Sequence, residues 1–69
     1  MVEVFATNVH EPAEARTLVA LLQQHFPGSK INFDLSDCDK VLRVEGTNIC
    51  PEEVTLLVTA TGFRCTVLE

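Results

Sequence analysis

The chain has few basic residues and no long hydrophobic run. Its five lysines and arginines stand against ten acidic residues, giving a net charge of −5, and they are spread singly along the 69 residues. Without a basic cluster there is no phosphate-binding stripe, so we expect no nucleic-acid partner. The longest apolar run, residues 18–22, falls far short of the roughly 20 residues that span a bilayer, and no signal peptide precedes the first predicted strand. We therefore expect no membrane partner and a cytoplasmic location.

Motifs of catalysis are also missing. The chain has three glycines, too few for a glycine-rich phosphate loop, and no serine or cysteine lies in a Gly-x-Ser-x-Gly or comparable nucleophile motif. We expect that the protein is not an enzyme.

The cysteines do not form a recognisable framework. Cys38, Cys50 and Cys65 include no Cys-x-x-Cys pair, and an odd number of cysteines argues against a complete set of disulfides. In a reducing compartment all three are expected to be free thiols.

What the chain does have is the composition of one small folded domain. Hydrophobic residues make up 46% of it and include four phenylalanines, which is typical of a globular core and too high for a disordered chain. Residues 1–69 are therefore predicted to form a single domain of modest stability.

The first part of the pattern predicts a strand followed by a helix. Residues 2–7 alternate in the period-two manner of a strand with at least one buried face. Pro12 suits a first helical position, and Pro27-Gly28 supplies a stop. Between them, apolar residues recur at the three-and-four spacing of one helix face, namely Ala15, Leu18, Val19, Leu22 and Phe26.

The rest of the pattern predicts a hairpin, a second helix and a last strand. Residues 31–35 and 42–44 alternate on either side of a polar turn at residues 36–40. Pro51, followed by two glutamates, makes a good helix opening, and Gly62 closes the helix. One face of this helix holds Val54, Leu57, Val58 and Thr61, and residues 63–68 form the last strand. Its β-branched residues disfavour a helix, so tertiary packing has to hold it.

This order of elements predicts an α+β fold. Strand, helix, strand, strand, helix, strand most simply forms a ferredoxin-like βαββαβ sandwich, in which both helices cover one face of a four-stranded antiparallel sheet. The other sheet face is then open to solvent or a partner, and we expect Phe5, Thr7, Arg43 and Thr66 to lie on it. The loop after the first strand, the hairpin turn and residues 62–63 meet at one end of the sheet, where we expect any site.

Four features occur together in one known family. They are Asn8-Val9 after the first strand, the apolar spacing of residues 15–26, Pro27-Gly28 after the helix, and Gly62-Phe63 before the last strand. With these features the chain resembles, over nearly its whole length, the heavy-metal-associated domain of copper chaperones and metal-pumping ATPases. In that family the first strand runs into Gly-Met-x-Cys-x-x-Cys, and this Cys-x-x-Cys metal motif is absent here.

The resemblance implies an exchange of ligand type at the family's metal site. Aligning Val9 with the family's methionine places Glu11 and Glu14 on the two cysteine positions. Thiolates hold Cu(I) because both are soft, whereas carboxylates are hard ligands that favour magnesium, calcium or manganese. We therefore expect no cofactor of the family's kind. A divalent metal held by His10, Glu11 and Glu14 is an alternative, although the helix dipole alone also explains acids at a helix start.

The remaining candidate side chains have structural explanations. Cys65 is expected in the core as a small hydrophobic residue, and the acidic neighbours of Cys38 make it a poor nucleophile. His25 suits the negative end of the first helix. A further alternative is a soft metal site formed by His10, Cys38 and Cys65. Because metal–sulfur bonds are only about 2.3 Å long, such a site would require the hairpin to approach the last strand across the sheet.

Three functions are compatible with these residues. The favoured one is a non-catalytic binding or interaction module that keeps the heavy-metal-associated fold without its thiolates, and that meets a protein partner or a second copy through the open sheet face or an edge. The second is a metal-binding or metal-transport protein with loop ligands other than cysteine. The third is a regulatory domain that senses a small ligand, which rests on fold-level analogy.

Overall fold

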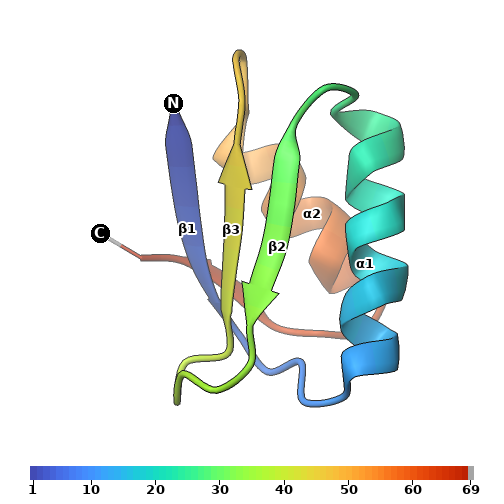
Figure 1. Ribbon diagram of the computed structural model, residues 1–69, viewed down its shortest axis with the longest axis vertical. Helices are drawn as coiled ribbons and strands as arrows, with labels where there is room; N and C mark the ends of the chain where they lie inside the picture. The colour runs from blue at the N-terminus through green and yellow to red at the C-terminus, as the bar shows by residue number, and fades with distance from the viewer. Residues whose placement is uncertain (69) are drawn as a thin grey trace.

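The computed structural model describes residues 1–68, which form six elements in the order βαββαβ (Figure 1). Their bounds are β1 Val2–Thr7, α1 Pro12–His25, β2 Lys30–Asp34, β3 Val41–Glu45, α2 Pro51–Ala60 and β4 Cys65–Val67.

The four strands make one antiparallel sheet in the order β2-β3-β1-β4. This is the ferredoxin-like α+β arrangement, so the predicted fold class is confirmed. The last strand is shorter than the predicted residues 63–68, since it covers only Cys65–Val67. It begins at Cys65 because Cys65 lies opposite Thr7, where β1 ends and no strand remains to pair with.

Helix α1 follows from signals at both of its ends. Pro12 occupies the first turn, Glu14 lies near the positive end of the helix dipole, and His25 lies near the negative end. The chain leaves the helix at Phe26 and turns through Gly28, whose φ of +85° is a left-handed conformation that suits glycine. The buried face of the helix consists of Ala15, Leu18 and Leu22.

Helix α2 forms in spite of its β-branched residues because two of them are locked in the core. Val54 and Val58 are fully buried against the sheet. The hydroxyls of Thr55 and Thr59 each donate a hydrogen bond to the carbonyl four residues earlier, at 3.0 and 2.8 Å. Tertiary packing therefore outweighs the low helix propensity of this segment, as predicted from its sequence.

The predicted sides of β1 are wrong at two positions. Phe5 was expected on the open face, but it is fully buried and lies opposite the equally buried Leu42, on the side of the sheet that the helices cover. Thr7 has the same parity as Phe5 and shares that side. Arg43 and Thr66 are exposed on the open face, as predicted. Val4, opposite Arg43, takes the place expected for Phe5, because burying the larger phenyl ring removes more apolar surface from water.

Candidate functional site

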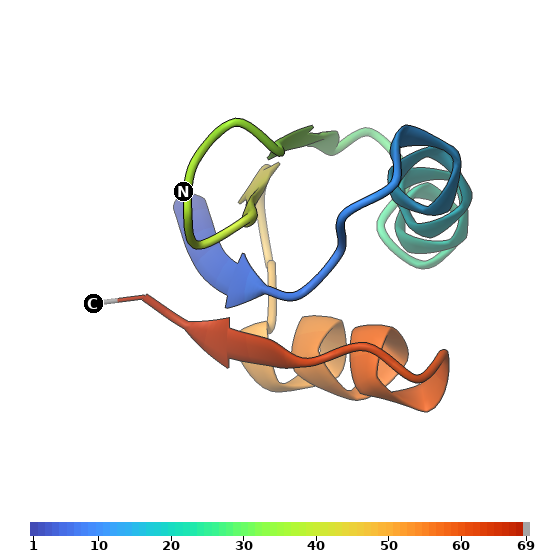
Figure 2. The same ribbon diagram turned by 90° about the horizontal axis from the view of Figure 1, so that it is seen from below.

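The outer edge of β2 is the unpaired long edge of the sheet. β2 pairs with β3 over all five of its residues, and within residues 1–68 no backbone hydrogen bond joins it to another segment. Viewed from below, β2 lies at one end of the curved sheet (Figure 2). In an antiparallel pair every second residue directs its N–H and C=O away from its partner, so β2 presents free donors and acceptors along this edge.

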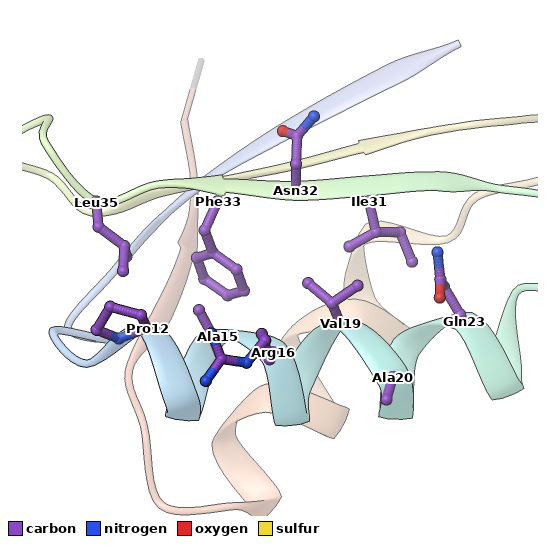
Figure 3. A pocket seen from close by; sticks show the side chains of 10 residues that line it. All are labelled: Pro12, Ala15, Arg16, Val19, Ala20, Gln23, Ile31, Asn32, Phe33 and Leu35. Atoms are coloured by element: carbon purple, nitrogen blue, oxygen red, sulfur yellow. The ribbon is translucent and has the colours of Figure 1, made fainter.

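An apolar groove lies between β2 and α1, directly beside this edge. Its volume is about 470 Å³, and its strand wall consists of Ile31, Phe33 and Leu35. Figure 3 shows these three side chains pointing toward α1, where Val19 and Ala15 meet them from the helix. The polar side chains of Arg16 and Gln23 lie at the helix side of the groove. The surface therefore combines a bare strand edge with an apolar trough.

The alternation of β2 builds this surface. Ile31 and Phe33 point to the helix side, whereas Asn32 points to the open face (Figure 3). Ile31 is buried, with 8% of its surface exposed, and Phe33 is half-buried. Val19 is also half-buried, because α1 turns it toward β2 rather than into the centre of the core. The apolar walls of the groove thus consist of residues at the rim of the core.

The residues of the predicted metal site lie on and beside the loop between β1 and α1. His10, Glu11 and Glu14 are all exposed. Glu11 is the residue before α1, and its side chain makes no capping hydrogen bond. The structure does not bring metal-ligating atoms of these three side chains within 4.8 Å of one another. The divalent site stays a prediction, for which calorimetric titration with manganese, calcium and zinc is the direct measurement.

A different group of ligating side chains does come together in the hairpin turn. Asp37, Cys38 and Asp39 have atoms within 4.8 Å of one another, and all three are exposed. The Asp37 carboxylate accepts the Asp39 N–H at 2.9 Å, while the Asp37 carbonyl accepts the Lys40 N–H at 3.0 Å. These bonds are those of a turn that an aspartate stabilises, so the cluster has a structural explanation.

Three loops meet at one end of the sheet, as predicted. The Thr7 N–H donates to the Asp39 carbonyl at 2.9 Å, and the Thr7 hydroxyl donates to the carbonyl of Lys40. On the other side, the Asn8 side-chain oxygen accepts the Arg64 N–H at 2.7 Å. This end is held together by hydrogen bonds between the loops, whereas the apolar groove runs along the flank of the molecule.

The pKa values of Cys65 and Asp34 are shifted, each for a local reason. Burial raises the pKa of the Cys65 thiol, while a hydrogen bond with the Thr55 hydroxyl acts in the opposite direction. Cys65 is buried, which confirms its predicted place in the core. The Ser36 hydroxyl donates to the Asp34 carboxylate at 2.6 Å and so lowers the pKa of that group.

The Cys65 thiol predicts how stability depends on alkaline pH. Its pKa is raised in the folded state, so above the ordinary thiol value of about 9.0 the unfolded chain loses a proton that the folded chain retains. The free energy of unfolding should be unaffected by this group below that pH. It should fall as pH rises above it, by at most about 1.4 kcal/mol per pH unit, until the folded-state pKa is passed. Urea unfolding from pH 8 to 11 measures the slope.

Two alanine variants separate this effect from general alkaline damage. Cys65→Ala should flatten the slope, whereas Cys38→Ala, which removes an exposed thiol, should leave it unchanged. An unaltered slope in Cys65→Ala would show that burial of this thiol is not its cause.

Comparison with known proteins adds no identification. No protein-family model, curated protein sequence or solved structure matches this chain. Among residues 1–68, neither helix is long and apolar enough to span a membrane. The resemblance to heavy-metal-associated domains therefore stays a prediction from the sequence.

Sequence reasoning did not identify the groove. The available signal was Val19, one more apolar residue on the first helix than the core needs, together with the apolar Ile31, Phe33 and Leu35 of the strand that follows. The predicted fold already makes β2 an edge strand, but the space between that strand and α1 depends on how the whole core packs.

Proposed function

We propose that the chain is a non-catalytic protein-interaction module that binds an extended polypeptide segment along β2. The added segment takes the place of a fifth strand, and every second side chain of it enters the groove between β2 and α1. The observation that carries the proposal is the unpaired edge of β2 beside an apolar trough of about 470 Å³.

The two parts of this surface have separate roles. The free N–H and C=O groups of Lys30–Asp34 hydrogen-bond any extended backbone, so they supply affinity without selecting a sequence. The groove selects apolar side chains at alternate positions, because Val19, Ile31 and Phe33 offer only hydrocarbon. The preferred segment is therefore about five residues long with apolar residues at every second position.

The proposal also accounts for the loop after β1. We propose that the chain keeps the element order of heavy-metal-associated domains while Glu11 and Glu14 stand where that family has its thiolates. Binding in this chain then depends on the flank of the sheet, and the positive end of the α1 dipole explains the exposed acids at the start of that helix.

Selection from a library of displayed random peptides tests the proposal. Peptides selected on the purified protein should contain alternating apolar residues and should shift the backbone amide NMR signals of residues 30–34 together with the methyl signals of Val19 and Ile31. Val19→Lys should weaken binding at least about tenfold, because it places a charged side chain in the apolar groove. Lysine is a good helix former, so α1 itself should be retained.

A lysine elsewhere on the same helix serves as the control. Thr17 is exposed and outside the groove, so Thr17→Lys should bind the selected peptides like the unmodified protein. Peptides that shift signals on the far side of the sheet, or that bind both variants equally, would contradict the proposed site.

A further inference from the structure

The sequence of β2 is complementary to itself in the antiparallel direction. The strand reads Lys30, Ile31, Asn32, Phe33, Asp34, with a basic residue at one end, an acidic residue at the other and apolar residues on either side of a central asparagine. When two copies pair antiparallel with Asn32 opposite Asn32, each Lys30 lies opposite an Asp34 and each Ile31 lies opposite a Phe33. Every position then faces a residue of matching chemistry.

We propose that the partner at the β2 edge is a second copy of this chain, joined in that register to form a continuous eight-stranded sheet. The inference rests on the proposed function, since it names the occupant of the same edge. A two-fold axis passes through the Asn32 pair, so the contact closes on itself and gives a dimer rather than a fibre.

The faces of the sheet support this register over its neighbours. Lys30 and Asp34 lie on the open face, where both are exposed, so the two symmetric ion pairs form at a solvent-exposed surface. A shift by one residue would join the open face of one copy to the helix side of the other. A shift by two would leave Lys30 opposite Asn32 and remove both ion pairs. Of these registers, only the one centred on Asn32 both pairs Lys30 with Asp34 at each end and keeps the helices of both copies on one side.

The groove gives the same register a hydrophobic component. On the helix side Ile31 and Phe33 of one copy meet Phe33 and Ile31 of the other, and both belong to the groove wall. The grooves of the two copies therefore adjoin across the axis, with a helix α1 on each flank. Half-buried Val19 and Phe33 lose contact with water there, which favours association.

Charge reversal with mixing tests the pairing. Lys30→Asp places acids opposite acids, and Asp34→Lys places bases opposite bases, so each variant alone should raise the dimer dissociation constant by roughly tenfold or more. An equimolar mixture restores opposite charges at both ends and should form a heterodimer as tight as the unmodified homodimer. Sedimentation equilibrium between 10 µM and 1 mM, with a reductant to keep Cys38 free, measures each species.

Two controls exclude effects of folding and of net charge. A folding control is needed because Asp34→Lys also removes the hydrogen bond from Ser36. Circular dichroism should show that both variants are folded, and recovery of the dimer in the mixture itself requires folded partners. Arg64→Asp reverses an exposed charge next to the opposite edge strand and should leave the dimer intact.

The outcomes separate this inference from the function on which it rests. A protein that is monomeric at 1 mM would overturn the dimer, and so would a dimer that both charge reversals leave unchanged. If that monomer still binds selected peptides along residues 30–34, the interaction module stands and only the identity of its partner is wrong. If those peptides also fail to bind, both are wrong.

Discussion

Phe5→Ala should remove most of the stability of the domain. The Phe5 side chain has 0% of its surface exposed and lies opposite Leu42 on one of the two central strands. Truncating a buried phenylalanine to alanine costs about 3–5 kcal/mol. A chain of 69 residues has a total stability of only about 3–10 kcal/mol. Urea unfolding followed by circular dichroism should show a midpoint shifted far toward zero denaturant, or no folded baseline.

The neighbouring residue is the matched control for Phe5. Val4 is half-buried on the open face, opposite Arg43, so Val4→Ala should cost about 1 kcal/mol or less. A larger loss in Val4→Ala than in Phe5→Ala would mean that the two sides of β1 are reversed. Equal losses would mean that the open face is covered in solution.

The two sides of β1 illustrate where sequence reasoning reaches its limit. Residues 2–7 carry apolar side chains on both sides of the strand, so the period-two pattern alone does not say which side is buried. The pairing with β3 decides it, because Leu42 and Val44 are fully buried on either side of the exposed Arg43, and Phe5 lies opposite Leu42. Element order needed no such help, since Pro12, Gly28, Pro51 and Gly62 mark the helix ends by local backbone chemistry alone.

The candidate site was less predictable than the fold for a physical reason. A groove exists only between elements, and its walls on α1 and β2 are positioned by packing of the whole core rather than by either segment. The metal site predicted from His10, Glu11 and Glu14 depends on their spacing in the sequence. Spacing along a chain does not determine whether exposed side chains come close together in space. The edge character of β2 follows from the strand order, which the predicted fold already contained.

Leu22→Ala is expected to have the second large effect on stability. Leu22 is fully buried on the face of α1 that packs on the sheet, and truncating a buried leucine costs about 2–5 kcal/mol. The chain offers a chemically identical control, because Leu56 on α2 has 67% of its surface exposed. Leu56→Ala should cost less than about 0.5 kcal/mol, since little apolar surface returns to water and alanine is the better helix former.

Comparing these two leucines also tests how α2 is oriented. Helix α2 buries Val54 and Val58 and turns Leu56 outward, so its apolar residues cover more of its circumference than the core uses. If Leu56→Ala costs as much as Leu22→Ala in urea unfolding at neutral pH, Leu56 is covered in solution. Repeating the measurement at tenfold higher protein concentration then distinguishes the two causes. A cost that depends on concentration locates Leu56 in an interface between copies, and a cost that does not requires α2 to be rotated from its described position.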